Sequence, residues 1–468
     1  MQLVYGVKDK PKFAQLIIFA IQQLLAIMAA TIVVPVLVSS NTNLAEADAL
    51  SASAALFGAG VGTLIYQLFT KFRSPVFLGS SFAFIGSMVA AFAGAMSNVY
   101  LGYLGLLIGV AFAGLIYVII AIVVKVAGVN WINKLMPTAV IGPTVALIGL
   151  SLASAAISDV FSYGEKVTFG VSSYYVMQPN IWASVICAMV TLFVVIICSV
   201  YGKKMTKLIP FIIGILAGYI VALVFTLIGN ATGNDALKVI DFAPFKALVA
   251  DGVGINTFFA VPKFTFLNAF KGVKDFSWTY VATIAVAYIP VAFVVFAEHI
   301  ADHKNLSSII ENDLLEEPGL SRTLLGDGIG SIVGAFFGGC PNTTYGESVG
   351  CVAITKNASI ITITTTAIMA IIISFISPFV AFLDSIPGCV MGGVCITLYG
   401  FIAVSGLKMI QKVNLESNAN LFTVAAILIP GIGGMAMGIG KVFITNIACA
   451  LILGIIVNLI VSKATDRE

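Results

Sequence analysis

The chain has 468 residues, of which 60% are hydrophobic and only 10% are charged. Soluble domains usually carry about 25% charged residues, so this composition excludes an ordinary soluble protein. Apolar runs near the ~20 residues needed to cross a bilayer recur from end to end. The sequence therefore predicts a multi-span, all-α membrane protein, whereas the formal net charge of +3 says little about partners.

Fourteen apolar segments follow one another along the chain, and we predict that each crosses the membrane. They cover approximately residues 13–38, 48–70, 76–96, 101–124, 136–155, 182–201, 208–229, 278–303, 321–338, 342–355, 358–383, 387–408, 418–437 and 442–462. We expect the third and tenth segments to consist of a short extended piece followed by a half-helix. The thirteenth contains the run PGIGG at 430–434, which would strain a straight helix.

Basic residues gather on one side of these segments. With the N-terminus placed inside the cell, most of the 24 lysines and arginines lie on the cytoplasmic side. Most of the others fall in one long predicted external loop, where the positive-inside rule is weakest. The charge distribution therefore predicts that both termini are cytoplasmic.

The third and tenth segments are interrupted at matching places. Residues 79–84 (GSSFAF) and 341–347 (PNTTYGE) break the apolar sequence with glycine, proline and small polar residues. Non-helical backbone is tolerated at membrane depth only where it lines a cavity enclosed by protein. Paired interruptions at corresponding positions of two halves point to a transporter binding site near the midplane.

An internal repeat supports this division into halves. Residues 136–142 (MPTAVIG) resemble residues 386–392 (IPGCVMG), and the two runs open the fifth and twelfth segments. Because each half has an odd number of segments, the second half must cross the membrane in the opposite sense. The sequence thus predicts two inverted seven-segment repeats.

Three carboxylates, Glu298, Asp327 and Glu347, lie inside or at the edge of predicted spans. A charge at a helix centre costs roughly 2.5–3.5 kcal/mol on insertion scales, so such residues are functional candidates by default. For Asp327 an interfacial position near the cytoplasmic start of the ninth segment is an equal alternative. Glu298 and Glu347 are the stronger candidates.

Both histidines of the chain, His299 and His303, lie beside Glu298. Glu298 and Asp302 are four positions apart and therefore share one helix face. Histidine exchanges protons near neutral pH, so this cluster suits proton coupling. The alternative for Asp302 and His303 is a polar cap where the helix meets the cytoplasm.

The predicted half-helices also indicate a type of ligand. A helix N-terminus presents free N–H groups that favour carbonyl groups or anions, and Phe82 or Phe84 could stack on a flat ring. Ionised Glu298 and Glu347 accept hydrogen bonds from ring N–H groups. A planar ring carrying N–H and C=O groups, such as a nucleobase, fits best, although other small heterocycles remain open.

The run NTTYGESVG at 342–350, followed by AITK at 353–356, resembles the signature of the nucleobase–ascorbate transporter family. The runs GSSFAF at 79–84 and AEH at 297–299 are also similar to this family. In detail the chain resembles the branch of bacterial uracil:proton symporters, and the resemblance covers essentially its whole length. It implies a homodimer in the bacterial plasma (inner) membrane.

The resemblance also implies a division into domains. A core domain would comprise residues 1–128 (segments 1–4) and 278–385 (segments 8–11). A gate domain would comprise residues 129–230 (segments 5–7) and 386–468 (segments 12–14 and a short tail), and residues 231–277 would form the external loop. The substrate would lie between core and gate.

Carried over by position, Glu298 and Glu347 would hold the pyrimidine and Phe82 would contact its ring. Backbone groups at Phe82, Tyr345 and Gly346 would meet its polar edge. The purine-selective branch has a glutamine where Glu347 stands. We therefore predict a proton-coupled uracil importer that works by alternating access, with a xanthine or purine permease as the alternative.

Three departures from the family affect the predicted coupling mechanism. Residues 22–23 are Gln-Gln where many relatives have Gln-His. Asp302 stands where the uracil branch often has a histidine, and His303 follows one position later. Asp327 resembles the purine carriers. The candidates for proton coupling are therefore Glu298, Asp302, His303, Asp327 and Glu347.

The predicted partners are a nucleobase, membrane lipid and a second copy of the chain. We expect no cofactor apart from the co-transported proton, no metal and no nucleic acid. A membrane enzyme is the alternative from a different class. It would need a nucleophile, a metal cluster or a nucleotide-binding loop facing one compartment, and the sequence offers no convincing example.

Overall fold

The computed structural model describes residues 3–42, 44–45, 48–95, 98–128, 130–162, 164–169, 172–177, 179–203, 205–250, 252–439 and 442–461. The chain divides into two compact units, which we describe separately. The first unit comprises Met1–Ser151, Pro262–Ile372 and Phe401–Glu468, and the second comprises Leu152–Val261 and Ile373–Gly400.

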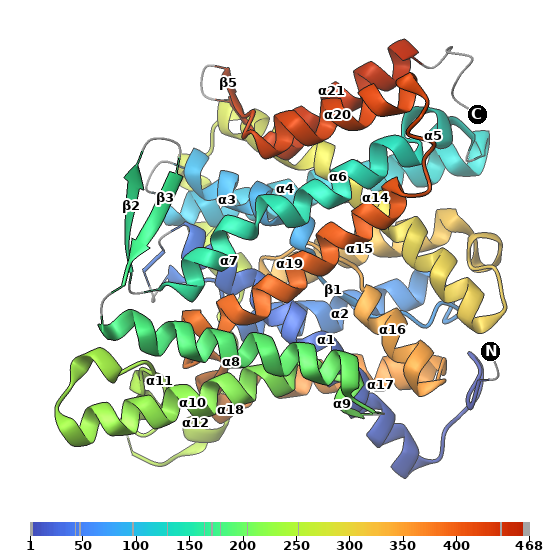
Figure 1. The fold of residues 1–468 in the computed structure, drawn as a ribbon. Helices are drawn as coiled ribbons and strands as arrows, with labels where there is room; N and C mark the ends of the chain where they lie inside the picture. Colours follow the sequence, from blue (N-terminus) through green and yellow to red (C-terminus); the bar gives the residue numbers. More distant parts are fainter. Residues whose placement is uncertain are drawn as a thin grey trace. The chain divides into compact units, whose positions relative to one another are not determined.

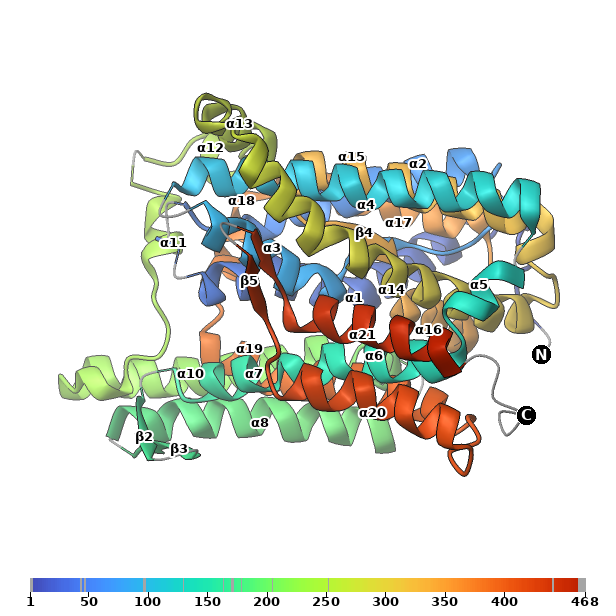
Figure 2. The same ribbon diagram turned by 90° about the horizontal axis from the view of Figure 1, so that it is seen from above.

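The first unit is built mainly from long helices (Figures 1 and 2). Its elements are α1 (Phe13–Asn41), α2 (Ala52–Phe69), β1 (Leu78–Ser80), η2 (Phe82–Phe84), α3 (Ile85–Gly94), α4 (Val99–Ala127), α5 (Asn130–Leu135), α6 (Thr138–Ser151), α13 (Thr265–Ala269), η4 (Phe270–Asp275), α14 (Trp278–Ile310), η5 (Leu315–Gly319), α15 (Leu320–Gly338), β4 (Asn342–Thr344), α16 (Gly346–Thr355), α17 (Ile360–Ile373), α20 (Asn418–Ile432), β5 (Met437–Ile439), β6 (Val442–Ile444) and α21 (Asn446–Ile460).

The second unit combines helices with one hairpin. Its elements are α7 (Ala153–Val160), β2 (Glu165–Phe169), β3 (Ser172–Val176), α8 (Pro179–Tyr201), α9 (Met205–Leu208), α10 (Pro210–Thr232), η3 (Asp235–Leu237), α11 (Ala243–Ala247), α12 (Ile255–Phe258) and α18 (Ser377–Asp384). Helix α19 (Gly388–Ile410) begins in this unit and ends in the first.

Eight helices in the described part of the chain are long and apolar enough to cross a membrane, and four shorter apolar helices have 10 to 17 residues. Each of the fourteen predicted segments contains a helix. The chain is therefore mostly helical, as the sequence predicts.

The described residues form three two-stranded sheets, and one of them, β1–β4, consists of the extended pieces predicted in the third and tenth segments. The sequence-based prediction missed the hairpins β2–β3 and β5–β6. The second hairpin shortens the last two predicted helical segments. Helix α20 ends at Ile432, just before the left-handed Gly434, and α21 starts only at Asn446.

Helices α2 and α15 pack closely against each other in the first unit. A β-carbon on Gly58 would lie 2.2 Å from the carbonyl oxygen of Gly334, and one on Gly62 would lie 2.7 Å from that of Gly330. Small residues spaced four apart allow helix backbones to approach this closely. The side-chain amide of Asn342 donates to the Gly58 carbonyl at 3.2 Å, which ties strand β4 to the same helix pair.

Candidate functional site

Strands β1 and β4 join the two interrupted segments. They pair antiparallel with Gly79 opposite Thr343, and the Ser81 N–H donates to the Pro341 carbonyl at 2.8 Å. A helical segment follows each strand: η2 begins at Phe82 and α16 at Gly346. The extended pieces predicted in the third and tenth segments are therefore confirmed, and each leads into a short helix.

The Tyr345 ring packs directly over strand β1. A β-carbon on Gly79 would lie 2.3 Å from ring carbons of Tyr345, so only glycine fits there without displacement. The Tyr345 hydroxyl donates to the Ser80 carbonyl at 2.8 Å, and the Tyr345 N–H donates to the Phe77 carbonyl at 3.2 Å. Because the Tyr345 N–H is already bonded, the N–H groups at the start of α16 that a ligand could use begin with that of Gly346.

Helix α1 is also hydrogen-bonded to the segment that contains the paired strands. The Gln23 amide donates to the Ser348 hydroxyl at 2.5 Å, and the Phe77 N–H donates to the same oxygen at 3.0 Å. All three residues are buried. Ser348 therefore connects α1 and the start of β1 to the first turn of α16.

Asp302, a residue of α14, lies beside the N-terminus of helix α16. Its Oδ2 accepts a hydrogen bond from the Thr344 hydroxyl at 3.0 Å, and a β-carbon on Gly346 would lie 3.7 Å from its Oδ1. A helix N-terminus carries partial positive charge, which stabilises a nearby carboxylate. The structure thus brings Asp302 of α14 beside the proposed ligand-binding backbone.

Glu298 and Glu347 are half-buried, and their carboxylates repel each other electrostatically. They come from helices α14 and α16, which pack against one another. Two like charges in partly dehydrated surroundings are costly unless a ligand or a proton offsets them. This pair can therefore respond both to a hydrogen-bond donor and to a proton.

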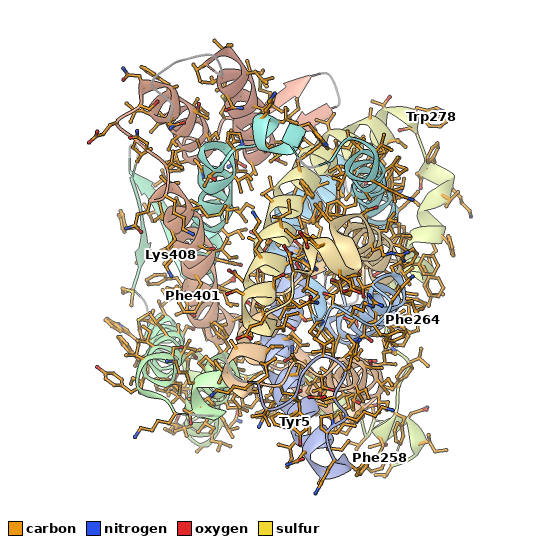
Figure 3. The ribbon with its side chains drawn as sticks, turned by 90° about the vertical axis from the view of Figure 1, so that its right-hand side faces the viewer. Tyr5, Phe258, Phe264, Trp278, Phe401 and Lys408 are labelled. Carbon is orange, nitrogen blue, oxygen red and sulfur yellow. The ribbon has the colours of Figure 1, made fainter. Side chains whose placement is uncertain are left out.

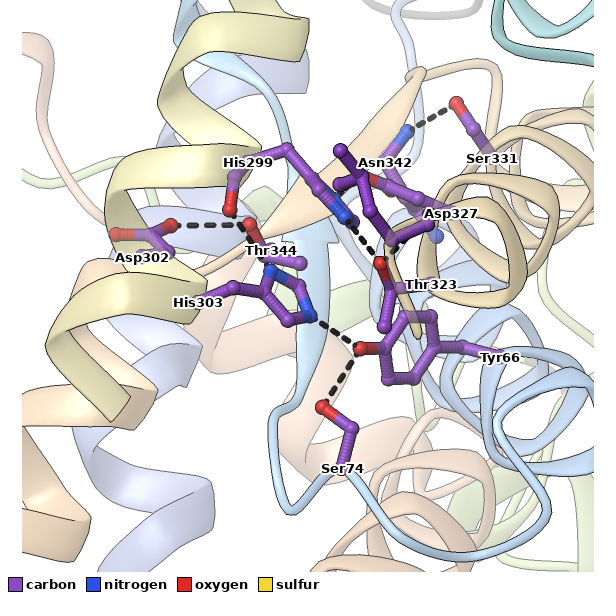
Figure 4. Close-up of polar contacts among 11 residues, drawn as sticks. Tyr66, Ser74, His299, Asp302, His303, Thr323, Asp327, Ser331, Asn342 and Thr344 are labelled. Carbon is purple, nitrogen blue, oxygen red and sulfur yellow. Dashed lines mark hydrogen bonds and ion pairs between the residues drawn. The ribbon is translucent and has the colours of Figure 1, made fainter. Parts of the chain in front are cut away.

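Asp327 is completely buried inside the first unit. Its Oδ2 lies 2.7 Å from Nδ1 of His299, which is also 0% exposed (Figure 4). Nε2 of His299 lies 3.0 Å from the Thr323 hydroxyl. The Asp327 carboxylate of α15 and the His299 imidazole of α14 thus form a hydrogen-bonded pair inside the first unit.

His303 continues this polar network on the next turn of α14. Its ring stacks on His299 with centroids 4.0 Å apart, and its Nδ1–H donates to the His299 carbonyl at 2.8 Å. Nε2 lies 2.7 Å from the Tyr66 hydroxyl oxygen, which in turn lies 2.7 Å from the Ser74 hydroxyl oxygen (Figure 4). Since His303 is buried and α14 continues to Ile310, it does not form the polar helix cap considered above.

The sequence-based prediction missed Tyr66, Ser74 and Thr323. Tyr66 and Gln67 are polar side chains within the apolar run that becomes α2, which was the available signal. Nothing in the local pattern reveals that Tyr66 contacts a histidine 237 positions later. These residues complete the polar network but were not among the predicted site residues.

The two candidate aromatic residues have different surroundings. Phe84 is buried and stacks on Tyr288 with centroids 5.5 Å apart, whereas Phe82 is half-buried. Phe84 is therefore committed to packing. The predicted binding residues with some exposure in the first unit are Phe82, Glu298, Gly346 and Glu347.

Tyr345 is buried, and its ring packs against strand β1.

Within the described ranges, no group of three or more His, Cys, Asp or Glu residues is arranged to hold a metal ion. The carboxylates and histidines are held by the bond between His299 and Asp327 and by hydrogen bonds to the hydroxyl groups of Thr323, Thr344 and Tyr66.

Long apolar helices around the paired strands β1 and β4 define the fold of a multi-pass membrane protein, and a solved structure shares this fold. The fold is similar to that of the transmembrane domain of a cyanobacterial bicarbonate transporter, BicA. The TM-score is 0.58 with 14% sequence identity, over 97% of this chain and 99% of that one.

The sequence comparisons identify the family. The Permease family matches residues 14–439, and the chain belongs to it. It is 35% identical to the uracil permease of Bacillus subtilis over 471 residues, covering 99% of this chain and 96% of that protein. It is 36% identical to the uracil permease of Bacillus caldolyticus over 460 residues, covering 98% and 94%.

Proposed function

We propose that this protein imports uracil together with protons by alternating access. The observation that carries the proposal is the antiparallel pairing of β1 and β4, where α16 begins beside Asp302 and packs against α14, the helix that carries Glu298. The near full-length similarity to uracil permeases supports uracil as the substrate. A xanthine or other purine carrier of the same family remains the alternative.

Uracil presents two ring N–H groups and two carbonyl oxygens to such a site. Glu298 and Glu347 accept hydrogen bonds from the ring N–H groups. The free N–H groups in the first turn of α16, starting at Gly346, donate to a ring carbonyl. Phe82 contacts the face of the ring. The partial exposure of these four residues within the first unit supports this assignment.

Proton coupling follows from the cost of binding a neutral ring against ionised carboxylates. Uracil displaces water from Glu298 and Glu347, which raises the cost of their mutual repulsion. A proton taken from outside onto Glu298 or Glu347 relieves that repulsion, and one on Asp302 lowers the total negative charge of the three carboxylates. Asp327 and His303 lie in the hydrogen-bonded groups behind this site and are further candidates to carry the proton.

The proposed architecture has fourteen membrane spans in two inverted seven-segment repeats. Residues 1–128 and 278–385 form the core, and residues 129–230 and 386–468 form the gate. The protein works as a homodimer in the bacterial plasma membrane with both termini in the cytoplasm. The eight long apolar helices and the likeness to another transporter domain support this architecture.

The test is uptake of labelled uracil into proteoliposomes, with and without an inward proton gradient. We expect gradient-driven uptake by the native chain and its loss in Glu298→Gln, since the amide cannot exchange a proton. Glu316→Gln is the matched control, because Glu316 is exposed and lies outside the site. It should transport normally.

Each outcome distinguishes one part of the proposal. Driven uptake that survives in Glu298→Gln would refute the placement of the site but not the substrate. Uptake that does not respond to the gradient would refute proton coupling. No uracil uptake by folded protein, together with uptake of labelled xanthine, would favour the purine alternative.

A further inference from the structure

The segment between Thr265 and Trp278 has its apolar side facing away from the protein. It consists of α13 and the 3₁₀ helix η4, followed by the first residue of α14. Leu267, Phe270 and Val273 are 52%, 60% and 51% exposed. Residues three apart align on one side of a 3₁₀ helix, so these large apolar side chains form a single exposed ridge.

The opposite side of this segment carries small residues. Thr265, Ala269 and Gly272 are buried, and a β-carbon on Gly272 would lie 2.2 Å from the Tyr100 carbonyl oxygen. A surface helix in water normally turns its large apolar residues toward the core. Apart from Phe266, which stacks on Phe336 with ring centroids 4.7 Å apart, this segment has the reverse arrangement, so water is not the medium that its outer face fits.

Charged side chains flank the ridge and hold the segment against α4. Lys271 lies 5.0 Å from the centre of the Tyr100 ring, and the Asn98 amide donates to Asp275 at 2.6 Å. Asn98 caps the N-terminus of α4. The segment therefore lies across the end of an apolar helix that is long enough to span the bilayer (Figure 2).

A second span begins at the same level. The Tyr280 hydroxyl in the first turn of α14 lies between two carbonyl oxygens, 2.8 Å from that of Ala91 and 3.0 Å from that of Leu101 near the start of α4. Trp278, the first residue of α14, is 79% exposed (Figure 3). Tryptophan and tyrosine concentrate where membrane spans meet the headgroup layer, and Trp278 and Tyr100 lie at the starts of two helices long and apolar enough to span the bilayer.

We propose that the segment from Thr265 to Trp278 lies in the outer headgroup layer of the bilayer, with its ridge of Leu267, Phe270 and Val273 inserted among the upper acyl chains. Interfacial helices bury their apolar face about 5–10 Å into this boundary. The ridge then continues the apolar outer face of α4, where Leu115 and Ile119 are exposed. This proposal does not depend on which substrate the protein carries.

The test places nitroxide labels on the full-length protein in phospholipid nanodiscs. Phe270→Cys and Val273→Cys each carry one label on the ridge, and Lys274→Cys is the matched control at an exposed neighbour off the ridge. Collisions with oxygen, which enters lipid, are compared with collisions with a water-soluble nickel complex. We expect the oxygen-to-nickel ratio to be several-fold higher at both ridge positions than at the control.

The seven native cysteines are buried, and the unsubstituted chain measures their background labelling. Because a cysteine on the ridge could loosen the segment, Trp278 supplies a second measurement that leaves it intact. With Trp131 and Trp182 replaced by phenylalanine, brominated lipids should quench Trp278 more strongly when bromine is placed near the headgroup than near the chain end.

Two results would overturn the proposal. If nickel reaches the ridge labels as readily as the Lys274 position and brominated lipids do not quench Trp278, the segment lies in water. If both reagents are excluded and the ridge labels show dipolar broadening between copies, a second copy of the chain covers the ridge.

Discussion

Replacing Gly79 with alanine tests whether the Tyr345 ring sets the geometry of the crossed strands. The added methyl group would lie 2.3 Å from two ring carbons and 2.8 Å from the hydroxyl oxygen. The ring cannot swing away freely, because its hydroxyl is bonded to the Ser80 carbonyl and its backbone N–H to Phe77. Accommodation therefore requires a shift of β1 or of the start of α16.

The expected cost follows from the behaviour of overpacked cores. Extra methyl groups in well-packed interiors destabilise by about 1–3 kcal/mol. If this whole cost falls on the state that binds uracil, the dissociation constant rises by about 5- to 150-fold. A cost distributed equally between free and bound states would instead lower thermal stability and leave affinity unchanged.

The assay is uracil binding by calorimetry, together with thermal unfolding of the purified protein. Gly86→Ala is the matched control, since nothing lies within 4 Å of a β-carbon at Gly86 and this glycine is in the helix that follows β1. Alanine stabilises a helix interior relative to glycine. The control should therefore bind as tightly as the native chain and unfold no earlier.

A double-mutant cycle shows whether the ring is responsible. Tyr345→Leu removes the ring carbons and the hydroxyl that the new methyl group would contact. In that background, Gly79→Ala should cost close to nothing, which gives a coupling of about 1–3 kcal/mol. An equal cost of Gly79→Ala in both backgrounds would refute the reasoning, as would a native-like Gly79→Ala variant.

Two further predictions concern the polar network. Asp327→Leu leaves Nδ1 of the buried His299 without its partner, which costs about 1–3 kcal/mol for an unsatisfied buried polar group, so the protein should unfold at a lower temperature. Asp327→Asn keeps an oxygen acceptor and should stay folded; equal behaviour of the two variants would contradict the pairing. Tyr66→Phe removes the hydroxyl bonded to His303 and should lower stability by about 1–3 kcal/mol, measured by thermal unfolding. Adding Ser74→Ala should cost little more, and a fully additive second loss would show that the hydroxyl pair is not shared.

The positions of the site's backbone elements were predictable from sequence. Glycine, proline and small polar residues at 79–84 and 341–347 indicated extended pieces before short helices, and the structure has β1 and β4 there. The reason is that non-helical backbone is tolerated at membrane depth only where protein or a water-filled cavity satisfies its polar groups. What the local pattern lacked was the pairing partner, because strand register depends on residues far apart in the chain.

The ends of helices and the polar network were less predictable. The apolar part of α14 ends near residue 303, yet the helix continues to Ile310. Hydropathy marks where a helix leaves an apolar environment and not where its backbone bonding stops. Similarly, Asp327 followed a glycine near a predicted span end, and only helix packing shows that it is buried against His299.

The pairing of β1 with β4 has a consequence for how the protein is made. Ser80 and Tyr345, which bond across this crossing, are 265 positions apart in the chain. At roughly 5–20 residues per second, the ribosome needs on the order of tens of seconds to deliver the second strand. During that interval the backbone groups of β1 lack their partners, and lipid cannot satisfy them. The first half must therefore remain next to the insertion machinery, or keep water around β1, until the second half arrives.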